Sequence, residues 1–466
     1  MPMLLQILSE RWKIAGITFL FLLLWALLLN FATDCFVVGT ECSSNVHRSL
    51  SPILGYISTG QLRDGSNLDV VYTVHPVGYG MFLYAIDAYE GMRPFFPAIV
   101  LQGIFLFVSG LMVFSITKEN WGPAAILAFA LTIFNPNLIF VFFQPKEDGL
   151  FAFLVTCAMF AAFAYRRRPT WTSAIACGIA IGVATNVRPA TYYLIFILPV
   201  LTVSVEFFAD RTKNYFNAFI KGCAGTAIGF LLIFPWLSHV NSTGEGYGLT
   251  DHSLKLAWAS DFRAMLEDTR VRSPNARDAL LGSYDDASRK TLLTSFGPER
   301  AKLLSDTVAG WSDLGIREKN KLRYDDMMTQ LKDYSVQTYL IAALPNLRFL
   351  LFSGGEGEFF KAFGIHEVLP LWMEKNPRLY MLVKVGFIGF SLILKMFALL
   401  GIWYLIRRGH YDVLVLFFGV ILYFFLVHMY HGSPRYRAPI EPIFAIMAAC
   451  GMINVKDWIG RTMQRH

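Results

Sequence analysis

Four short polar clusters hold the residues of this chain that could take part in chemistry. The last cluster lies between two apolar runs and contains His431, Arg435, Tyr436 and Arg437. The planar guanidinium group of arginine donates in a fork that matches two phosphate oxygens at once. We therefore expect Arg435 and Arg437 to clamp a lipid phosphate, with Tyr436 between them and His431 in support.

Arg188 is a further candidate for anion binding. It lies at the end of an apolar run, directly before Pro189, which opens the next helix. A helix that begins with proline presents unpaired backbone N–H groups at its N-terminus, and these attract anions. Arginine at such a position can instead reach lipid headgroups. We favour a role in the site, because the external leaflet has no special need of arginine.

Adjacent carboxylates form another cluster. Glu147 and Asp148 lie in the turn between two very apolar runs. They either cap the following helix and complement its dipole, or orient a substrate or hold a divalent cation such as Mg²⁺ or Mn²⁺, which prefers oxygen ligands. The sequence leaves both roles open.

The segment 33–94 supplies the candidates for a general base, which must accept a proton within hydrogen-bond reach. The carboxylate candidates are Asp34, Glu41 and Asp69. His75 is an alternative, although its place before Pro76 suits entry into a helix as well. Each of these acids taken singly is more simply a solvated loop charge.

All four clusters lie at the ends of apolar stretches, so membrane helices must position them. Hydrophobic residues make up 55% of the 466 residues and charged residues only 16%, against about 25% in soluble proteins. This composition excludes a water-soluble enzyme and a disordered chain. Runs long enough to cross a bilayer, which needs roughly 20 residues, occur near residues 14–32, 95–116, 122–142, 149–165, 171–187, 190–208, 216–238, 379–406, 411–428 and 438–455. We expect an all-α polytopic membrane protein of about ten transmembrane helices.

Basic residues orient these spans. Lysines and arginines gather at alternate ends, including the run 166–168 and both termini, as is typical of cytoplasmic ends. The net charge of +7 is then a consequence of topology and does not indicate nucleic acid as a partner. The four polar clusters fall on the opposite, external side.

Three parts are expected along the chain: an N-terminal transmembrane module with the first external loop, an external and mainly helical loop domain, and the C-terminal transmembrane helices. Their bounds are 1–238 (with the loop at 33–94), 239–378 and 379–466. Cys35 and Cys42 lie in the first loop, where an oxidising compartment favours a disulfide. Two free thiols are the alternative.

In their order and sidedness, these motifs resemble the GT-C glycosyltransferases, in particular the bacterial branch with protein O-mannosyltransferase-like and aminoarabinose-transferase-like enzymes. The motifs are the helix after His75-Pro76, the turn Lys146-Glu147-Asp148, the step Asn186-Val187-Arg188-Pro189 and the closing Pro434-Arg435-Tyr436-Arg437. The resemblance covers residues 1 to about 235 and 379 to 466. It leaves the large external loop unmatched.

The resemblance implies transfer of a sugar, with inversion, from a polyprenyl-phosphate carrier to a glycan, lipid or protein acceptor. It also implies a bacterial inner membrane, with the active face periplasmic and both termini cytoplasmic. In the family, an acid of the first external loop is the general base, and an acid matching Glu147 or Asp148 holds the site or a divalent cation. Arginines matching Arg188, Arg435 and Arg437 stabilise charge on the phosphate.

One position departs from the family pattern. Asn45 occupies the slot of the acid in the first external loop, and Ser49 occupies the slot of a tyrosine. Asparagine cannot serve as a general base. Either Asp34, Glu41 or Asp69 takes that role, or the chain is a diverged or inactive member.

Other classes of membrane protein fit part of the pattern. A secondary transporter has a similar number of spans, but its site lies near the bilayer midplane on broken helices of internal repeats, and no repeat is visible here. A ligase or polymerase of lipid-linked glycans shares the donor class but lacks an acidic base in the first loop. A scaffold without activity leaves the four clusters unexplained.

Overall fold

The computed structural model describes the membrane helices and the segments next to them. The described residues are 2–31, 41–59, 61–64, 67–71, 76–87, 96–209, 215–242, 375–428 and 434–464, with scattered positions between 314 and 359. For 2–11, 31, 41–49, 63–64 and 67–71 only the backbone is described. Most of the predicted loop domain at 239–378 therefore lies outside the described residues.

Apolar helices, most of them long, dominate this part of the chain. They are α1 (Pro2–Phe31), α4 (Phe96–Trp121), α5 (Ala125–Ile133), α6 (Pro136–Phe143), α7 (Glu147–Arg167), α8 (Trp171–Val187), α9 (Tyr192–Phe208), α10 (Tyr215–Ser242), α20 (Pro377–Arg407), α21 (Tyr411–His428) and α22 (Glu441–Met463). Eight helical stretches among the described residues have the length and hydropathy of a membrane span. The prediction of a polytopic helical membrane protein is confirmed.

The sequence predicts ten spans, and two local features account for the smaller number in the described residues. The runs near 95–116 and 122–142 form one apolar stretch, Phe96–Ile133, in which the 3₁₀ turn η1 (Gly122–Ala124) separates α4 from α5. Helix α8 has 17 residues. At 1.5 Å per residue it is about 26 Å long, slightly less than the hydrocarbon core of about 30 Å.

The predicted span at 122–142 is interrupted. Helix α5 ends at Ile133, and the Asn135 side chain caps α6 by accepting hydrogen bonds from the N–H groups of Asn137 (3.0 Å) and Leu138 (3.3 Å). Pro136 occupies the first turn of α6, where its missing N–H costs nothing. The result is a broken helix whose two halves are each too short to cross a bilayer.

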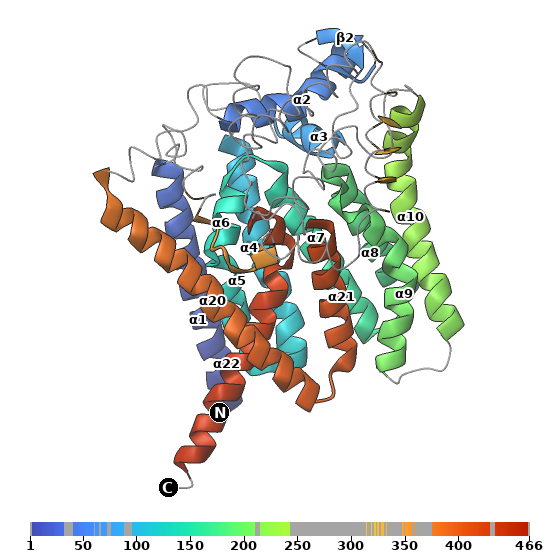
Figure 1. Ribbon diagram of the computed structural model, residues 1–466. Coiled ribbons are helices and arrows are strands. Elements are labelled where there is room, and N and C mark those ends of the chain that lie inside the picture. The colour runs from blue at the N-terminus through green and yellow to red at the C-terminus, as the bar shows by residue number, and fades with distance from the viewer. Residues whose placement is uncertain are drawn as a thin grey trace.

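The two ends of the helix bundle carry different elements. The helices α2 (Glu41–Thr59) and α3 (Gly78–Ala85) lie at one end, with a small antiparallel pair of strands, β1 (Arg63–Asp64) and β2 (Asn67–Val71). The start of α1 and the end of α22 lie at the other end (Figure 1). We call these the α3 end and the terminal end.

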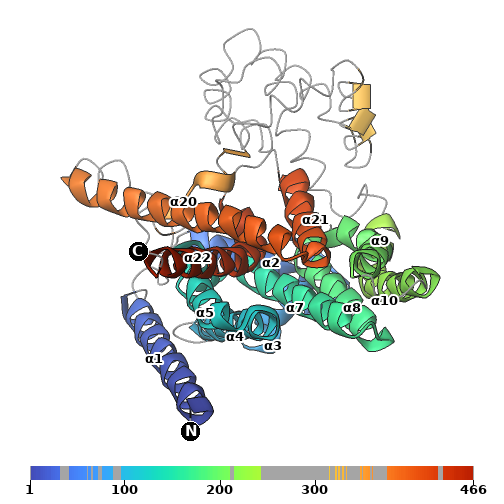
Figure 2. The ribbon, with the colours of Figure 1, turned by 90° about the horizontal axis from the view of Figure 1, so that it is seen from below.

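Helix α22 lies at the centre of the bundle. Every residue from Glu441 to Gly451 is buried, and α20 packs along one side of it (Figure 2). Helix α10 packs against both α8 and α9 on the far side. The buried core joins residues of α4, α7, α8, α21 and α22.

Glycines let α8 and α10 approach closely. Gly178 and Gly182 of α8 face Gly225 and Gly229 of α10, and a Cβ atom on Gly178 would overlap the carbonyl oxygen of Gly225. A Cβ atom on Gly182 would lie 2.7 Å from the carbonyl oxygen of Gly229. Small residues four apart are a recurrent packing motif of membrane helices. This contact fixes α8, which ends one residue before Arg188.

Candidate functional site

At the α3 end of the bundle, the structure brings Asp148, Arg188 and Arg435 together. Arg188 Nη1 forms an ion pair with Asp148 Oδ1, and Arg435 Nη1 lies 4.0 Å from Asp148 Oδ2. Asp148 is in the first turn of α7, Arg188 caps the C-terminus of α8, and Arg435 belongs to the 3₁₀ helix η3 (Pro434–Ile440). Three distant parts of the chain thus meet at one carboxylate, and we call this group the arginine cluster.

The ring of Tyr436 holds both arginines. The Cζ atom of Arg188 lies 4.5 Å from the ring centroid, and that of Arg435 lies 5.0 Å from it, distances at which cation–π attraction acts. Arg435 Nη2 also donates to the Tyr436 hydroxyl at 3.0 Å. The imidazole ring of His428 stacks on the ring of Tyr436, with 4.6 Å between the ring centroids and an interplanar angle of 10°. Sequence reasoning missed His428, although a lone polar residue ending an apolar span was a usable signal.

Burial differs across the arginine cluster. The exposed fraction of the side chain is 6% for Asp148, 14% for Arg188 and 28% for Arg435. Burial and the neighbouring positive charge of Arg435 lower the pKa of Arg188 from its ordinary value, while Glu147 and the hydrogen bond to Tyr436 act in the opposite direction. Arg435 is therefore the cation that an anion arriving from outside meets first.

The turn before α7 is fixed by a buried amide. Gln102 of α4, which is fully buried, donates from Nε2 to the carbonyl oxygen of Lys146 and to the hydroxyl of Tyr79, each at 3.1 Å. Tyr79 lies on α3, so one side chain joins α3, α4 and the acidic turn. The two acids that follow complement the dipole of α7. Gln102 was not among the predicted residues, although it is a single amide in an otherwise apolar span.

Arg188 is held in place by its backbone surroundings. Its N–H donates to the carbonyl oxygen of Ala184 at 2.8 Å, and the chain then turns through η2 (Pro189–Thr191) into α9. Just before it, Asn186 Nδ2 donates to the carbonyl oxygen of Leu232 on α10 at 3.0 Å. Helix α3 lies against the backbone at the end of α8, since a Cβ atom on Gly78 would be 2.5 Å from the backbone carbonyl oxygen of Asn186.

Arg437 does not join the arginine cluster. It is 1% exposed, and its Nε pairs with Glu441 one turn further along the chain. Its Nη atoms donate to the backbone carbonyl oxygens of Leu350, Leu351 (3.0 Å) and Ser353 (2.9 Å). These contacts tie the segment before α20 to the start of α22, so Arg437 serves the packing of the protein here.

Further buried polar groups surround Arg437. Asn135 Nδ2 donates to Glu441 at 3.0 Å, and Lys395 of α20 donates to the hydroxyl and, at 3.3 Å, to the carbonyl of Ser391. Glu441 and Lys395 are 1% and 8% exposed. Sequence reasoning missed this network, although a lysine within the apolar run of α20 is a signal of its own.

Several predicted residues cannot be placed in the same way. Asp34, His75 and His431 lie outside the described residues, and the side chains of Glu41, Asn45 and Asp69 do too, although their backbone belongs to α2 and β2. The general base therefore stays a prediction, as does the pairing of Cys35 with Cys42. The described cysteines are free thiols: Cys157, Cys177, Cys223 and Cys450.

The described residues do not fit a divalent cation at Glu147 and Asp148. No group of three or more His, Cys, Asp or Glu side chains is arranged to hold a metal in this part of the chain. Asp148 is paired with Arg188 and has Arg435 beside it. A cation bound there would face two positive guanidinium groups, which disfavour it.

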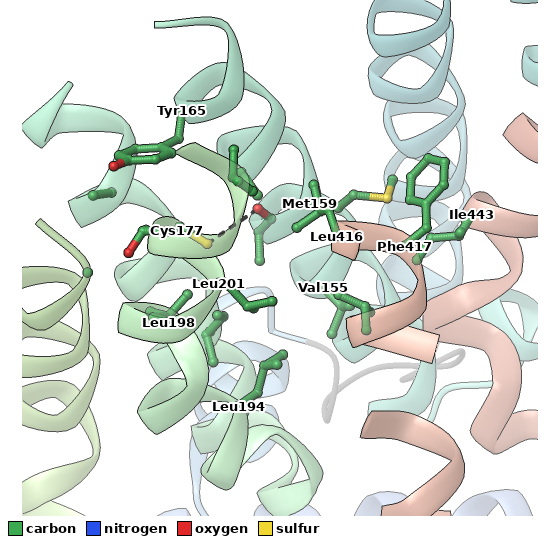
Figure 3. Close-up of a pocket in the computed structure, with 18 residues that line it drawn as sticks. Val155, Met159, Tyr165, Cys177, Leu194, Leu198, Leu201, Leu416, Phe417 and Ile443 are labelled. Atoms are coloured by element: carbon green, nitrogen blue, oxygen red, sulfur yellow. Dashed lines mark hydrogen bonds between the residues drawn. The ribbon is translucent and has the colours of Figure 1, made fainter. Parts of the chain in front are cut away.

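An apolar cavity of about 50 Å³ lies deeper in the bundle, between α7, α8, α9 and α21. Val155, Met159, Leu194, Leu198 and Phe417 point into it (Figure 3). Val155 is about two helical turns along α7 from Asp148. A cavity with such a lining favours apolar groups over water.

Comparison with protein-family models, with curated proteins and with solved structures finds no match to this chain. Fold and site together define a polytopic helical membrane protein with a cluster of arginine and carboxylate at one end of its helices. A functional assignment therefore depends on what that cluster can do.

Proposed function

We propose that this protein is an integral-membrane glycosyltransferase that moves a sugar, with inversion, from a polyprenyl-phosphate carrier to a glycan, lipid or protein acceptor. The observation that carries the proposal is the convergence of Arg188 and Arg435 on Asp148 and Tyr436. Two adjacent guanidinium groups match the oxygens of a phosphate diester. A membrane protein meets such a diester in a lipid-linked sugar.

The charges of the arginine cluster suit a leaving group that gains charge. The donor phosphate diester carries one negative charge, and cleavage of its bond to the sugar leaves a phosphate monoester with a second. Asp148 and Tyr436 hold Arg188 in a fixed position, and Arg435 is exposed enough to meet the phosphate. Preorganised groups aimed at developing charge usually give the largest share of catalysis.

The proton of the acceptor hydroxyl requires a separate base. Asp148 is held by one arginine and lies near another, which stabilises its ionised form and makes it a poor proton acceptor. We therefore assign the base to the first external segment, with Asp34, Glu41 and Asp69 as candidates. The acceptor hydroxyl loses its proton to that carboxylate as its oxygen bonds to the sugar carbon.

The placing of charge supports a periplasmic site in a bacterial inner membrane. Arginines 166–168 lie at the terminal end of the bundle, as expected for the cytoplasmic side. The arginine cluster lies at the α3 end, where topology alone does not favour positive charge. The apolar cavity beneath it has room for a short part of an isoprenoid chain.

The test uses the purified full-length protein in lipid nanodiscs with a panel of polyprenyl-phosphate sugars carrying a labelled sugar. Binding and consumption of at least one donor are expected, measured as release of the lipid phosphate. Loss of that activity in Arg188→Ala and Arg435→Ala would support the role of the arginine cluster. The proposal is wrong if no donor binds or reacts while a soluble ion or solute crosses vesicles that contain the protein.

One observation favours a secondary transporter as the second candidate. At the break between α5 and α6, Asn135 donates a hydrogen bond to the buried carboxylate of Glu441. Lys395 is also buried, within the apolar helix α20. Broken helices with buried charges are typical of transport sites. Solute uptake into vesicles that is lost in Glu441→Gln would support this candidate.

A further inference from the structure

A second cavity, of about 330 Å³, opens at the terminal end of the bundle, where α4 and α7 end and α8 begins. This volume is within the range of small-ligand sites, roughly 300–1,000 Å³. The wall includes apolar side chains, Ile116, Phe160 and Phe163, and the rim includes charged ones, Glu119, Arg167 and Arg168.

The rim charges are arranged so that an anion can be accepted. Arg167 Nη1 pairs with Glu119 Oε1 at 2.6 Å, and the two side chains are 60% and 46% exposed. An ion pair so exposed contributes little to stability. A phosphate can therefore replace Glu119 as the partner of Arg167 with little loss of free energy. Arg166 has a different role, because it pairs with Asp412 at 2.5 Å and donates to Asn120 at 2.6 Å.

The apolar wall continues from the rim toward the middle of the membrane. Phe163 and Phe160 precede Arg167 by about one and two helical turns on α7. Phe160 is 40% exposed, so it presents its ring outside the protein core. A phospholipid has the same order of groups, with a charged phosphate at the interface and apolar chains below it.

We propose that this cavity binds an anionic phospholipid from the leaflet at the terminal end. Its phosphate lies between Arg167 and Arg168, and the first part of its acyl chains lies against Phe160 and Phe163. The net positive charge of the rim favours an anionic over a zwitterionic headgroup, and the apolar wall accommodates the acyl chains. The inference is independent of the proposed glycosyltransferase activity.

The test compares the retention of phosphatidylglycerol and phosphatidylcholine with the same acyl chains on the detergent-purified full-length protein, measured by native mass spectrometry. Arg167→Ala and Arg168→Ala should each lower phosphatidylglycerol retention about fivefold, the contribution of one basic residue at a membrane surface. Glu119→Gln should raise it. The matched control is Arg407→Ala, an exposed arginine at the same end that lies over Trp403, outside the cavity.

A steric variant separates a built site from attraction by surface charge. Ala164→Trp fills the cavity without changing any charge and should lower phosphatidylglycerol retention, whereas Ala176→Trp, on the exposed face of α8 outside the cavity, should not. Undiminished retention in Ala164→Trp would overturn the proposal. Equal retention of the two lipids, or control-level retention in both arginine variants, would overturn it as well.

Discussion

Asp148 is the residue on which the arginine cluster depends. It pairs with Arg188 and lies 4.0 Å from Arg435, so two positive side chains remain side by side although they repel each other. Tyr436 adds an aromatic surface to both. The cluster therefore combines strong positive charge with a fixed geometry, which is what recognition of a phosphate requires.

The first prediction concerns the two arginines. Arg188→Ala and Arg435→Ala should each lower donor turnover by about 10²-fold or more, the usual loss for one charge-stabilising group. Turnover of a labelled lipid-linked sugar in nanodiscs is the measurement. Arg378→Ala is the matched control, since Arg378 is an exposed arginine at the start of α20. Wild-type turnover in both cluster variants would contradict the assignment.

The second prediction concerns Asp148 itself. Asp148→Asn keeps the shape of the side chain but leaves Arg188 without its carboxylate, and breaking such a pair by removing one partner costs roughly 3–5 kcal/mol when it is buried. The melting temperature in detergent should fall clearly. Glu147→Gln, at the more exposed neighbouring position, should melt closer to the wild type. Equal melting of Asp148→Asn and the wild type would show that the pair does not stabilise the fold.

At the scale of elements, close packing of α8 against α10 decides where Arg188 lies. The two helices touch through glycines, and Asn186 at the end of α8 bonds to the backbone of α10. Helix α20 approaches α22 in the same manner, since a Cβ atom on Gly401 would overlap the carbonyl oxygen of Met447. At such contacts an added side chain meets backbone atoms of the neighbouring helix, which cannot move aside as a flexible side chain can.

The third prediction tests that contact. Gly178→Ala should destabilise the protein by roughly 1–3 kcal/mol, because the added methyl group meets backbone and forces the helices apart. It should also lower donor turnover, since α8 carries Arg188. Gly389→Ala on α20, where nothing lies within 4 Å of an added Cβ atom, should melt like the wild type. Identical melting of both variants would mean that α8 and α10 are less tightly packed.

The fourth prediction concerns the tie between α22 and the segment before α20. Glu441→Ala leaves Arg437 buried without its carboxylate and should cost about 3–5 kcal/mol. The double variant Arg437→Met with Glu441→Leu removes both charges and should recover much of that loss. Thermal melting of the purified protein compares them. A double variant less stable than Glu441→Ala would show that the carbonyl contacts of Arg437 matter more than its charge balance.

At the scale of the whole molecule, groups of arginines lie at both ends of the helix bundle. The arginine cluster lies at the α3 end, where the end of α8 meets α3. Helix α7 runs from Asp148 in that cluster to the arginines 166–168 at its other end, on the side of the terminal end (Figure 1). In the proposed orientation, the positive-inside tendency accounts for the second group of charges but not for the first. The positive charge of the arginine cluster, which topology does not explain, is therefore the charge that we assign to function.

The fifth prediction tests this orientation. Met463→Cys at the terminal end and Arg378→Cys at the opposite end are placed in a background with the six native cysteines changed to serine. In intact cells, a thiol reagent that does not cross the inner membrane should label Arg378→Cys and not Met463→Cys. The reverse pattern would place the arginine cluster in the cytoplasm and remove the proposed donor and acceptor.

The sequence by itself determined the class of the protein and the candidates of the arginine cluster. Membrane spans follow from composition and length, since backbone groups must be paired inside a bilayer and a continuous apolar run of about 20 residues pairs them within one helix. The polar residues that interrupt such spans stand out for the same reason. Asp148, Arg188 and Arg435 could therefore be named without any knowledge of their contacts.

Only the tertiary structure decided which of these residues meet. Arg435 and Arg437 are two positions apart and chemically identical, yet η3 directs one toward Asp148 and the other toward Glu441. The break at Asn135 and the role of Gln102 also depend on partners far away in the chain. Local sequence sets which groups are costly to bury, but helix packing alone sets the partners that offset that cost.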